Sequence, residues 1–166
     1  CEGFDVVNED VRFPNDVVAA YDWVAEGESV VVLPFTESGE VVVIEEWRQP
    51  VRRGNRGLPA GGLEPEDDDP ADAVARELEE ETGYEPGAVE HLTSVEPTNG
   101  IADMVFHYFV ARDCTPSGRQ NLDYNEDIRV DTTTFDALVD AARGDALRDG
   151  RTMLGVLYYE LFGREG

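Results

Sequence analysis

Short apolar runs separated by polar turns divide the chain into segments of strand and helix length. Two β-branched runs at residues 30–33 and 41–44 flank a polar turn at residues 36–39, a pattern typical of a β-hairpin. Further strands are predicted at residues 105–111 and 128–134, and helices at residues 135–143 and 152–162. Strands and helices do not alternate in a regular rhythm, so we expect an α/β fold in which helices cover a mixed β-sheet.

The best-defined helix is predicted over residues 70–82. Asp69 can cap its N-terminus, Pro70 suits its first turn, and Gly83 marks its end. Apolar residues recur at i, i+3, i+4 and i+7, and they predict one stripe that faces the core. The stripe consists of Ala71, Val74, Ala75 and Leu78.

Acidic residues of the same helix converge beside that stripe. With about 3.6 residues per turn, Glu77, Glu80 and Glu81 share one sector, whereas Glu79 projects away from them. Glu77 and Glu81 repel each other as like charges at i and i+4, and a bound cation would reverse that repulsion. Acidity alone favours a solvated face, so the surrounding residues must decide between the two interpretations.

The charge balance of the chain is strongly acidic. It holds 37 acidic and 13 basic residues, for a formal net charge of −24, and every basic residue is Arg. Such self-repulsion is screened over about 3 Å at 1 M salt, so the composition predicts a halophilic protein in a salt-rich cytoplasm. A hydrophobic content of 41% argues against a disordered acidic chain. The negative surface disfavours nucleic acid as a partner.

The length of 166 residues fits a single domain, which we expect to span residues 1–166. Two cysteines are too few for a disulfide framework or a Cys-based zinc site, and this favours a reduced, cytoplasmic setting. The apolar stretches are strand-sized, and no basic-then-apolar leader begins the chain. We therefore expect no association with a membrane.

A spaced motif joins the predicted helix to the segment before it. Gly62 is followed by five residues, Asp68, seven residues, and then Arg-Glu-Leu-X-Glu-Glu-X-Gly-Tyr over residues 76–84. This pattern closely resembles the box of the Nudix hydrolase family. The resemblance implies a Nudix-type α/β/α sandwich with a mixed β-sheet. It gives structural roles in the motif to Gly62, Asp68 and Gly83, with Asp68 standing where the family has Glu.

The resemblance also implies a metal site on this helix. Glu77, Glu80 and Glu81 would bind Mg²⁺ or Mn²⁺, and hard carboxylate oxygens suit such ions. Arg76 is the candidate catalytic residue that braces a carboxylate, and Glu80, four residues away, is close enough to pair with it. A metal held there would neutralise a diphosphate and lower the pKa of an attacking water.

The segment before the box resembles one branch of the family. Residues 58–64 read Leu-Pro-Ala-Gly-Gly-Leu-Glu, an entry common in ADP-ribose and nucleotide-sugar pyrophosphatases. In that branch the Ala carbonyl helps to bind the metal, and Ala60 holds this position. The paired glycines let the backbone approach ions and phosphates closely.

An arginine-rich stretch from Trp47 to Leu63 contains no acidic residue. Guanidinium groups bind phosphate oxygens through paired hydrogen bonds, so this local reversal of sign predicts a binding edge for a small anionic nucleotide. The candidate substrate contacts are Arg48, Arg52 and Arg56, with Arg48 first. The alternative is that these arginines pair with distant acids.

The acidic loop at residues 123–127 resembles the loop that carries the general base in the same branch. Such a base must reach the attacking water directly or through one further water. Glu126 is the candidate. Asp123 is an alternative, and so is a mechanism in which the metals suffice.

The resemblance implies Mg²⁺-dependent hydrolysis of the diphosphate in a nucleoside diphosphate linked to a sugar, foremost ADP-ribose to AMP and ribose 5-phosphate. Asn99 stands where ADP-ribose pyrophosphatases have a marker proline, so nucleoside triphosphates and other nucleotide sugars stay open as substrates. A non-catalytic nucleotide-sensing module is the alternative from another class. The branch also implies a homodimer, with residues 1–27 as an N-terminal dimerisation extension.

Overall fold

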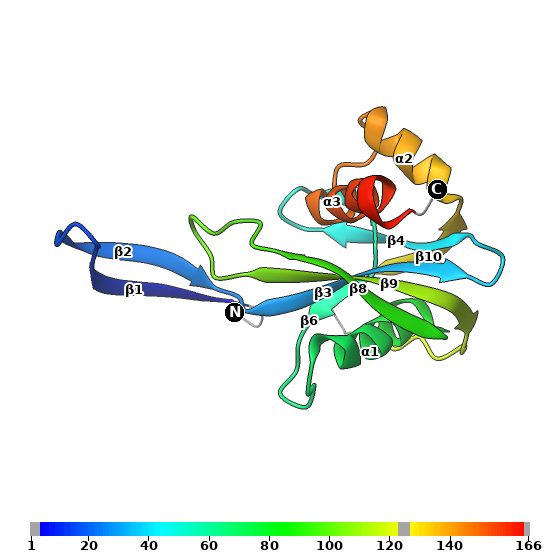
Figure 1. Cartoon of the computed structure of the whole chain (residues 1–166), viewed down its shortest axis with the longest axis horizontal. Coiled ribbons are helices and arrows are strands. Elements are labelled where there is room, and N and C mark those ends of the chain that lie inside the picture. Colours follow the sequence, from blue (N-terminus) through cyan, green and yellow to red (C-terminus); the bar gives the residue numbers. More distant parts are fainter. Residues whose placement is uncertain (1–3, 123–126, 165–166) are drawn as a thin grey trace.

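One mixed β-sheet forms the centre of the molecule (Figure 1). The computed structural model describes residues 4–122 and 127–164. The main path of the sheet runs through β10 (Ile128–Thr133), β4 (Val41–Arg48), β3 (Glu28–Thr36), β9 (Val105–Pro116) and β7 (Tyr84–Glu85). Beside this path, β5 (Arg53–Gly57) pairs with β4, β6 (Ala60–Gly62) with β3, and β8 (Ala88–Val95) with β9. The pair β3–β9 is parallel and its neighbours are antiparallel, so the mixed sheet is confirmed.

Helices cover both faces of the sheet. Helix α1 (Pro70–Thr82) packs on one face, and α2 (Phe135–Arg143) and α3 (Gly150–Tyr158) pack on the other (Figure 1). Helix α3 continues into a π-helical turn, η1 (Tyr159–Gly163). The three layers form an α/β/α sandwich, as the resemblance implied.

Strand β3 contributes to the core on both faces because its side chains alternate in direction. Val31 and Leu33 join the cluster under α2 and α3, while Val30 and Val32 join the cluster under α1. All four are at most 1% exposed. Since burial of one such side chain contributes about 1.5–3 kcal/mol, this strand anchors both layers.

Helix α1 has the predicted bounds because its local signals agree. The Asp69 carboxylate accepts a hydrogen bond from the Ala71 amide at 2.6 Å, Pro70 begins the helix, and Gly83 ends it in the left-handed conformation at φ 70°. The predicted core stripe is wrong at one position. Ala75 is exposed and Ala73 is fully buried, because the helix is rotated slightly so that Ala73, Val74 and Leu78 face the sheet.

A second, two-stranded sheet precedes the main one. Strands β1 (Asp5–Arg12) and β2 (Val18–Ala25) form an antiparallel hairpin that extends away from the body of the molecule (Figure 1). It contacts the body through residues 100–103, where the Val24 amide donates to the Ile101 carbonyl at 2.8 Å and the Asp103 amide donates to the Val24 carbonyl at 3.2 Å. Neither strand was predicted from the sequence, because their residues are largely exposed and show no buried periodic face. Among the described helices, none is long and apolar enough to cross a membrane.

Candidate functional site

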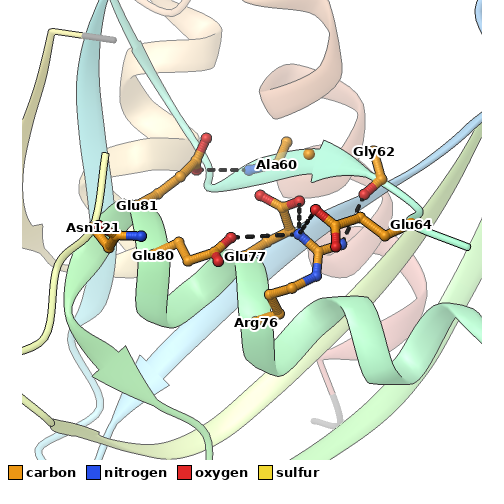
Figure 2. Close-up of a pocket in the computed structure, with 9 residues that line it drawn as sticks. Ala60, Gly62, Glu64, Arg76, Glu77, Glu80, Glu81 and Asn121 are labelled. Atoms are coloured by element: carbon orange, nitrogen blue, oxygen red, sulfur yellow. Dashed lines mark hydrogen bonds and ion pairs between the residues drawn. The ribbon is translucent and has the colours of Figure 1, made fainter. Parts of the chain in front are cut away.

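A cavity of about 250 Å³ lies beside the second half of α1 (Figure 2). Strand β6 and the loop after it form one wall, and α1 forms the other. The segment after β9 closes the end, because the Gln120 side chain donates to the Glu81 carbonyl at 2.8 Å and the Asn121 amide donates to the Glu80 carbonyl at 2.9 Å. The lining residues are Ala60, Gly61, Gly62, Glu64, Arg76, Glu77, Glu80, Glu81 and Asn121.

The carboxylates predicted from helical periodicity all line this cavity. Glu77, Glu80 and Glu81 face β6 together. Glu79 points elsewhere and forms an ion pair with Arg119, with 2.8 Å between Oε1 and Nε. Glu79 is therefore separated from the other three glutamates, as helical periodicity predicted.

Glu81 is the most deeply buried of these acids, at 5% exposure. Its Oε2 accepts a hydrogen bond from the Ala60 amide at 3.0 Å, which ties the helix to β6. Ala60 thus reaches the predicted position, with its amide committed to Glu81. The metal-binding role of its carbonyl stays a prediction.

Glu77 lies against Gly61 rather than Gly62. A Cβ atom built on Gly61 would overlap the Glu77 carboxylate, whereas a Cβ on Gly62 would meet no atom within 4 Å. Close approach of backbone to a functional side chain is a common reason for glycine at such a position. The glycine that the site requires is therefore Gly61. Gly62 contributes through its carbonyl, which accepts from Arg76 Nη2 at 2.9 Å.

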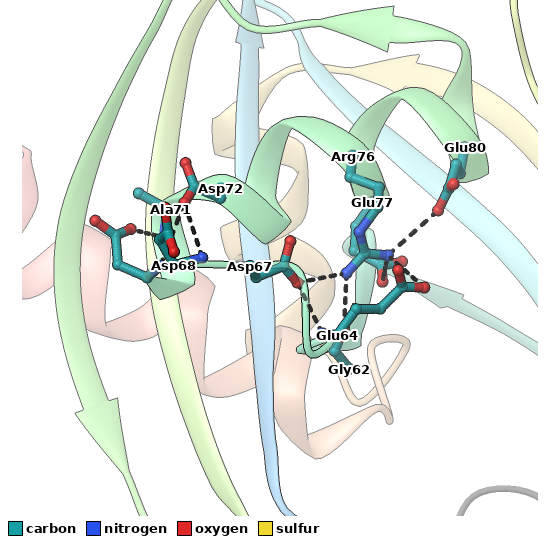
Figure 3. A network of polar contacts seen from close by, with 10 residues as sticks. Gly62, Glu64, Asp67, Asp68, Ala71, Asp72, Arg76, Glu77 and Glu80 are labelled. Carbon is teal, nitrogen blue, oxygen red and sulfur yellow. Dashed lines mark hydrogen bonds and ion pairs between the residues drawn. The ribbon is translucent and has the colours of Figure 1, made fainter.

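Arg76 connects the helix to the loop between β6 and α1 (Figure 3). Its Nη1 lies 2.6 Å from Glu77 Oε1 and 3.4 Å from Glu80 Oε2, so the predicted pairing with Glu80 is present. Burial opposes the charge of this guanidinium, but its hydrogen bonds with Asp67 and Glu77 outweigh that and raise the pKa of Arg76 above its ordinary value. Arg76 therefore stays cationic and contacts the site carboxylates.

Asp67 occupies the place expected for Asp68. Asp67 Oδ2 accepts from Arg76 Nη2 at 2.9 Å and from the Glu64 amide at 2.7 Å, and its side chain is 8% exposed. The bond from Arg76, reinforced by the Glu64 amide, lowers the pKa of Asp67. Asp68 is exposed and forms no ion pair with Arg76; its backbone amide donates to Asp72 at 3.2 Å. The expectation for Asp68 is corrected, because the path of the loop points the preceding side chain at Arg76.

The end of α1 agrees with the motif. Gly83 adopts a positive φ of 70°, which glycine does at little cost, and its carbonyl accepts from the Ser117 amide at 2.7 Å. That bond joins the helix end to the segment that carries Asn121. Gly83 therefore ends the helix at the predicted position, and its role in the motif stays a prediction.

A divalent cation fits the chemistry of this cavity. Its lining brings together carboxylates of Glu64, Glu77, Glu80 and Glu81, the hard oxygen donors that Mg²⁺ and Mn²⁺ accept. Within residues 4–122 and 127–164, no three acidic, His or Cys side chains lie close enough together to hold one ion. The physical reason is that Arg76 contacts both Glu77 and Glu80, while the Ala60 amide binds Glu81. Rotation of these side chains would have to accompany metal binding.

The predicted substrate arginines lie apart from this cavity. Arg48 pairs with Glu46 at 2.6 Å, Arg56 lies 3.9 Å from Asp131, and Arg52 lies in the turn between β4 and β5 with a positive φ of 53°. None of the three lines the cavity. Their contact with substrate stays a prediction. The pairing with a distant acid, raised as the alternative, is present for Arg56, whereas Arg48 pairs with an acid two residues away.

Other site residues were predicted incompletely or missed. Glu126, the candidate general base, lies outside the described residues, as does Asp123. Glu64 and Asn121 line the cavity without having been assigned a role. The signal for Glu64 was its place in the motif at residues 58–64. Asn121 had no local signal, because long-range hydrogen bonds bring it to the helix.

Comparison with known proteins places the chain in a family. A methanol dehydrogenase activator from Bacillus methanolicus is 31% identical over 154 residues, which is 92% of this chain and 83% of that protein. An ADP-ribose pyrophosphatase from Bacillus subtilis (strain 168) is 29% identical over 158 residues, 95% of this chain and 85% of that protein. A crystal structure of an ADP compounds hydrolase superposes with a TM-score of 0.81 at 19% identity, covering 98% of this chain and 87% of that one, and supports the fold. The NUDIX domain model matches residues 26–152, so the chain belongs to the NUDIX domain family.

Proposed function

We propose that this protein hydrolyses the diphosphate bond of a nucleoside diphosphate linked to a sugar, with ADP-ribose as the leading substrate and AMP and ribose 5-phosphate as products. The observation that carries the proposal is the cavity that Glu77, Glu80 and Glu81 line opposite β6. Glu77 packs directly against Gly61 there. Membership of the NUDIX family and similarity to an ADP-ribose pyrophosphatase over most of the chain support the substrate class.

Each residue has a proposed role in this reaction. Glu77, Glu80, Glu81 and the Ala60 carbonyl would hold Mg²⁺ or Mn²⁺, which supplies charge neutralisation of the diphosphate and a water of lowered pKa. Arg76 positions Glu77 and Glu80 from the side of the loop. Glu126 accepts the proton of the attacking water; it follows the cavity residue Asn121 by five positions in the sequence. Arg48, Arg52 and Arg56 bind substrate phosphates in this proposal.

A product-resolved hydrolysis panel tests this function. With Mg²⁺ in molar KCl, ADP-ribose should give AMP and ribose 5-phosphate faster than GDP-mannose or ATP is cleaved, and excess chelator should abolish turnover. Repeating the assay after dialysis to low salt should lower activity, because the proposed halophilic chain then loses screening of its charge of −24. Faster cleavage of ATP would favour the nucleoside triphosphate alternative. No turnover of any substrate would favour the sensing module.

We also propose that residues 1–166 form one domain and that the protein is a homodimer in the cytoplasm. Residues 1–27 would be the extension through which it dimerises. The family match begins only at residue 26, and the β1–β2 hairpin before it exposes Val6 (69%), Val17 (52%) and Val18 (56%). A two-stranded hairpin with little to pack against is marginally stable in water. Contact with a second copy would cover these side chains.

Light scattering on the full chain tests the homodimer. A mass of about twice 18.4 kDa is expected at micromolar concentration in molar KCl. The double change Val6→Asp and Val18→Asp should shift the protein to monomer, because charges would enter an apolar contact. Val89→Asp, at an exposed apolar residue on β8, is the matched control and should leave the mass unchanged. A monomeric full chain would contradict this part of the proposal.

A further inference from the structure

A second group of hydrogen-bonded side chains lies on the sheet and shares no residue with the lining of the cavity beside α1. It consists of Glu28 at the start of β3, His107 on β9, and Ser94 and His91 on β8. Ser94 pairs with His107 across the antiparallel strands β8 and β9, and β3 lies on the other side of β9 (Figure 1). Ser94 is 13 positions from His107, and Glu28 is 79 positions from it, so the sheet brings them together without any local motif.

The four side chains form one continuous series of hydrogen bonds. His107 Nε2 lies 2.7 Å from Glu28 Oε2, and His107 Nδ1 lies 2.8 Å from Ser94 Oγ. On its other side, Ser94 Oγ lies 2.9 Å from His91 Nε2. All three distances are those of well-formed hydrogen bonds. Each side chain therefore restrains the orientation of the next.

The carboxylate sets the direction of these bonds. In its ionised form Glu28 can only accept, so a neutral His107 donates from Nε2 and keeps an unprotonated Nδ1. That nitrogen accepts the hydroxyl proton of Ser94, and the Ser94 oxygen accepts in turn from His91 Nε2. His107 is thus a base directed at the Ser94 hydroxyl, and Glu28 stabilises the imidazolium that forms when the proton moves. A hydroxyl, an imidazole and a carboxylate bonded in this order form the arrangement of a serine nucleophile.

Ser94 also lines open space of ligand size. A second cavity, of about 350 Å³, is bordered by Ser94, Val95, Glu96, Asn99 and Val105. Ser94 is exposed, whereas the His107 side chain is only 16% exposed, so the hydroxyl is accessible and its base is covered. The Asn99 amide nitrogen donates to Glu96 at 3.3 Å and carries a second proton that can donate to a carbonyl oxygen. The two valines and the Glu96 carboxylate favour an uncharged ligand over an anionic one.

We propose that Ser94 is the nucleophile of a second, metal-independent site that hydrolyses small uncharged carboxylic esters. Ser94 Oγ attacks the carbonyl carbon, its proton passes to His107 Nδ1, and Asn99 donates to the carbonyl oxygen as negative charge develops there. The bond to the alcohol oxygen then breaks, and the alcohol leaves with the proton from His107. Water hydrolyses the acyl-serine in the same way, which releases the carboxylic acid and restores Ser94. Glu28 acts through His107 as a positioning residue.

Covalent labelling of the full chain with a fluorophosphonate tests the nucleophile. Such a probe bonds its phosphorus to an activated serine and releases fluoride, so peptide mass spectrometry should find the label on Ser94. Ser94→Ala should abolish labelling. Ser38→Ala, at an exposed serine that bonds to Thr36 and Glu40, is the matched control and should leave it unchanged. No label on the wild type, or a label only on other residues, would overturn the inference even where a variant failed to fold.

Turnover of p-nitrophenyl acetate in excess chelator supplies the second readout. His107→Gln should lower the rate at least about 100-fold, as expected for loss of a general base. Glu28→Gln should lower it by about tenfold, because the carboxylate is half exposed and solvent screens its charge, and Glu28→Asp should restore part of the loss. An unchanged rate in Ser94→Ala would assign the reaction to a surface imidazole, and loss of turnover in chelator would assign it to the metal cavity. Either result contradicts the proposal.

Heteronuclear NMR of the imidazole nitrogens tests the role of Glu28 independently of turnover. The chain contains two histidines, so the spectrum of His91→Gln assigns both rings. At mildly alkaline pH, His107 should carry its proton on Nε2. Glu28→Gln should populate both tautomers, because an amide can donate as well as accept, and Glu28→Asp should keep the proton on Nε2. A wild-type His107 protonated on Nδ1 could not accept the Ser94 proton and would overturn the inference.

Discussion

Replacing Glu81 by Gln is expected to reduce hydrolysis by at least about 100-fold, because even residues that only support metal ligands typically account for 10–100-fold. The Gln side chain keeps the shape of Glu and can still accept the hydrogen bond from the Ala60 amide. What it loses is a charge that the proposed cation requires. The variant therefore separates the electrostatic role of Glu81 from its structural role.

Glu79→Gln is the matched control for this experiment. It makes the same change two residues earlier on the same helix, at a side chain that points to Arg119 and does not line the cavity. Its activity should stay within about threefold of wild type, as expected for the loss of one ion pair with an exposed arginine away from the cavity.

Thermal unfolding distinguishes loss of function from loss of fold. Because Glu81 is a carboxylate at 5% exposure, the neutral Gln avoids the cost of burying charge, and the melting temperature should be equal to or above that of wild type. Full activity of Glu81→Gln at ordinary Mg²⁺ concentration would show that the metal ligands are placed wrongly.

The parts of the site that the sequence predicted are those with local causes. Helix α1 begins at Pro70 and ends at Thr82 because Asp69, Pro70 and Gly83 act within one turn of each end. Helical periodicity then placed Glu77, Glu80 and Glu81 on one side without any knowledge of the sheet. Periodicity did not fix the rotation of the helix about its own axis, so Ala73 is buried where Ala75 was predicted.

The parts that the sequence did not predict have tertiary causes. Whether Asp67 or Asp68 meets Arg76 depends on the path of a loop, and that path is set by bonds to the Glu64 amide and the Gly62 carbonyl. Asn121 reaches the cavity through a hydrogen bond to a residue 41 positions earlier, Glu80, so no local pattern marks it. The interval of five residues between glycine and acid is the same for Gly61 and Asp67 as for Gly62 and Asp68, so this interval alone could not reveal which pair meets the helix.

The paired glycines provide the second large effect. Gly61→Ala is expected to lower hydrolysis about 100-fold, because the new Cβ would overlap the Glu77 carboxylate and displace a proposed metal ligand. The overlapping atoms are the end of a side chain that can rotate, so the fold should survive and the melting temperature should change little. Mn²⁺ affinity should fall together with activity.

Gly62→Ala is the control that decides between the two glycines. Its Cβ would meet no atom within 4 Å, and its φ lies outside the positive range, so an alanine fits without strain. The carbonyl that accepts from Arg76 is retained. Activity should stay near wild type, and stability should rise by about 0.4–1 kcal/mol because alanine restricts the unfolded chain. If Gly62→Ala proved the more damaging change, the glycine and acid of the box would be Gly62 and Asp68. The assignment of these positions to Gly61 and Asp67 would then be wrong.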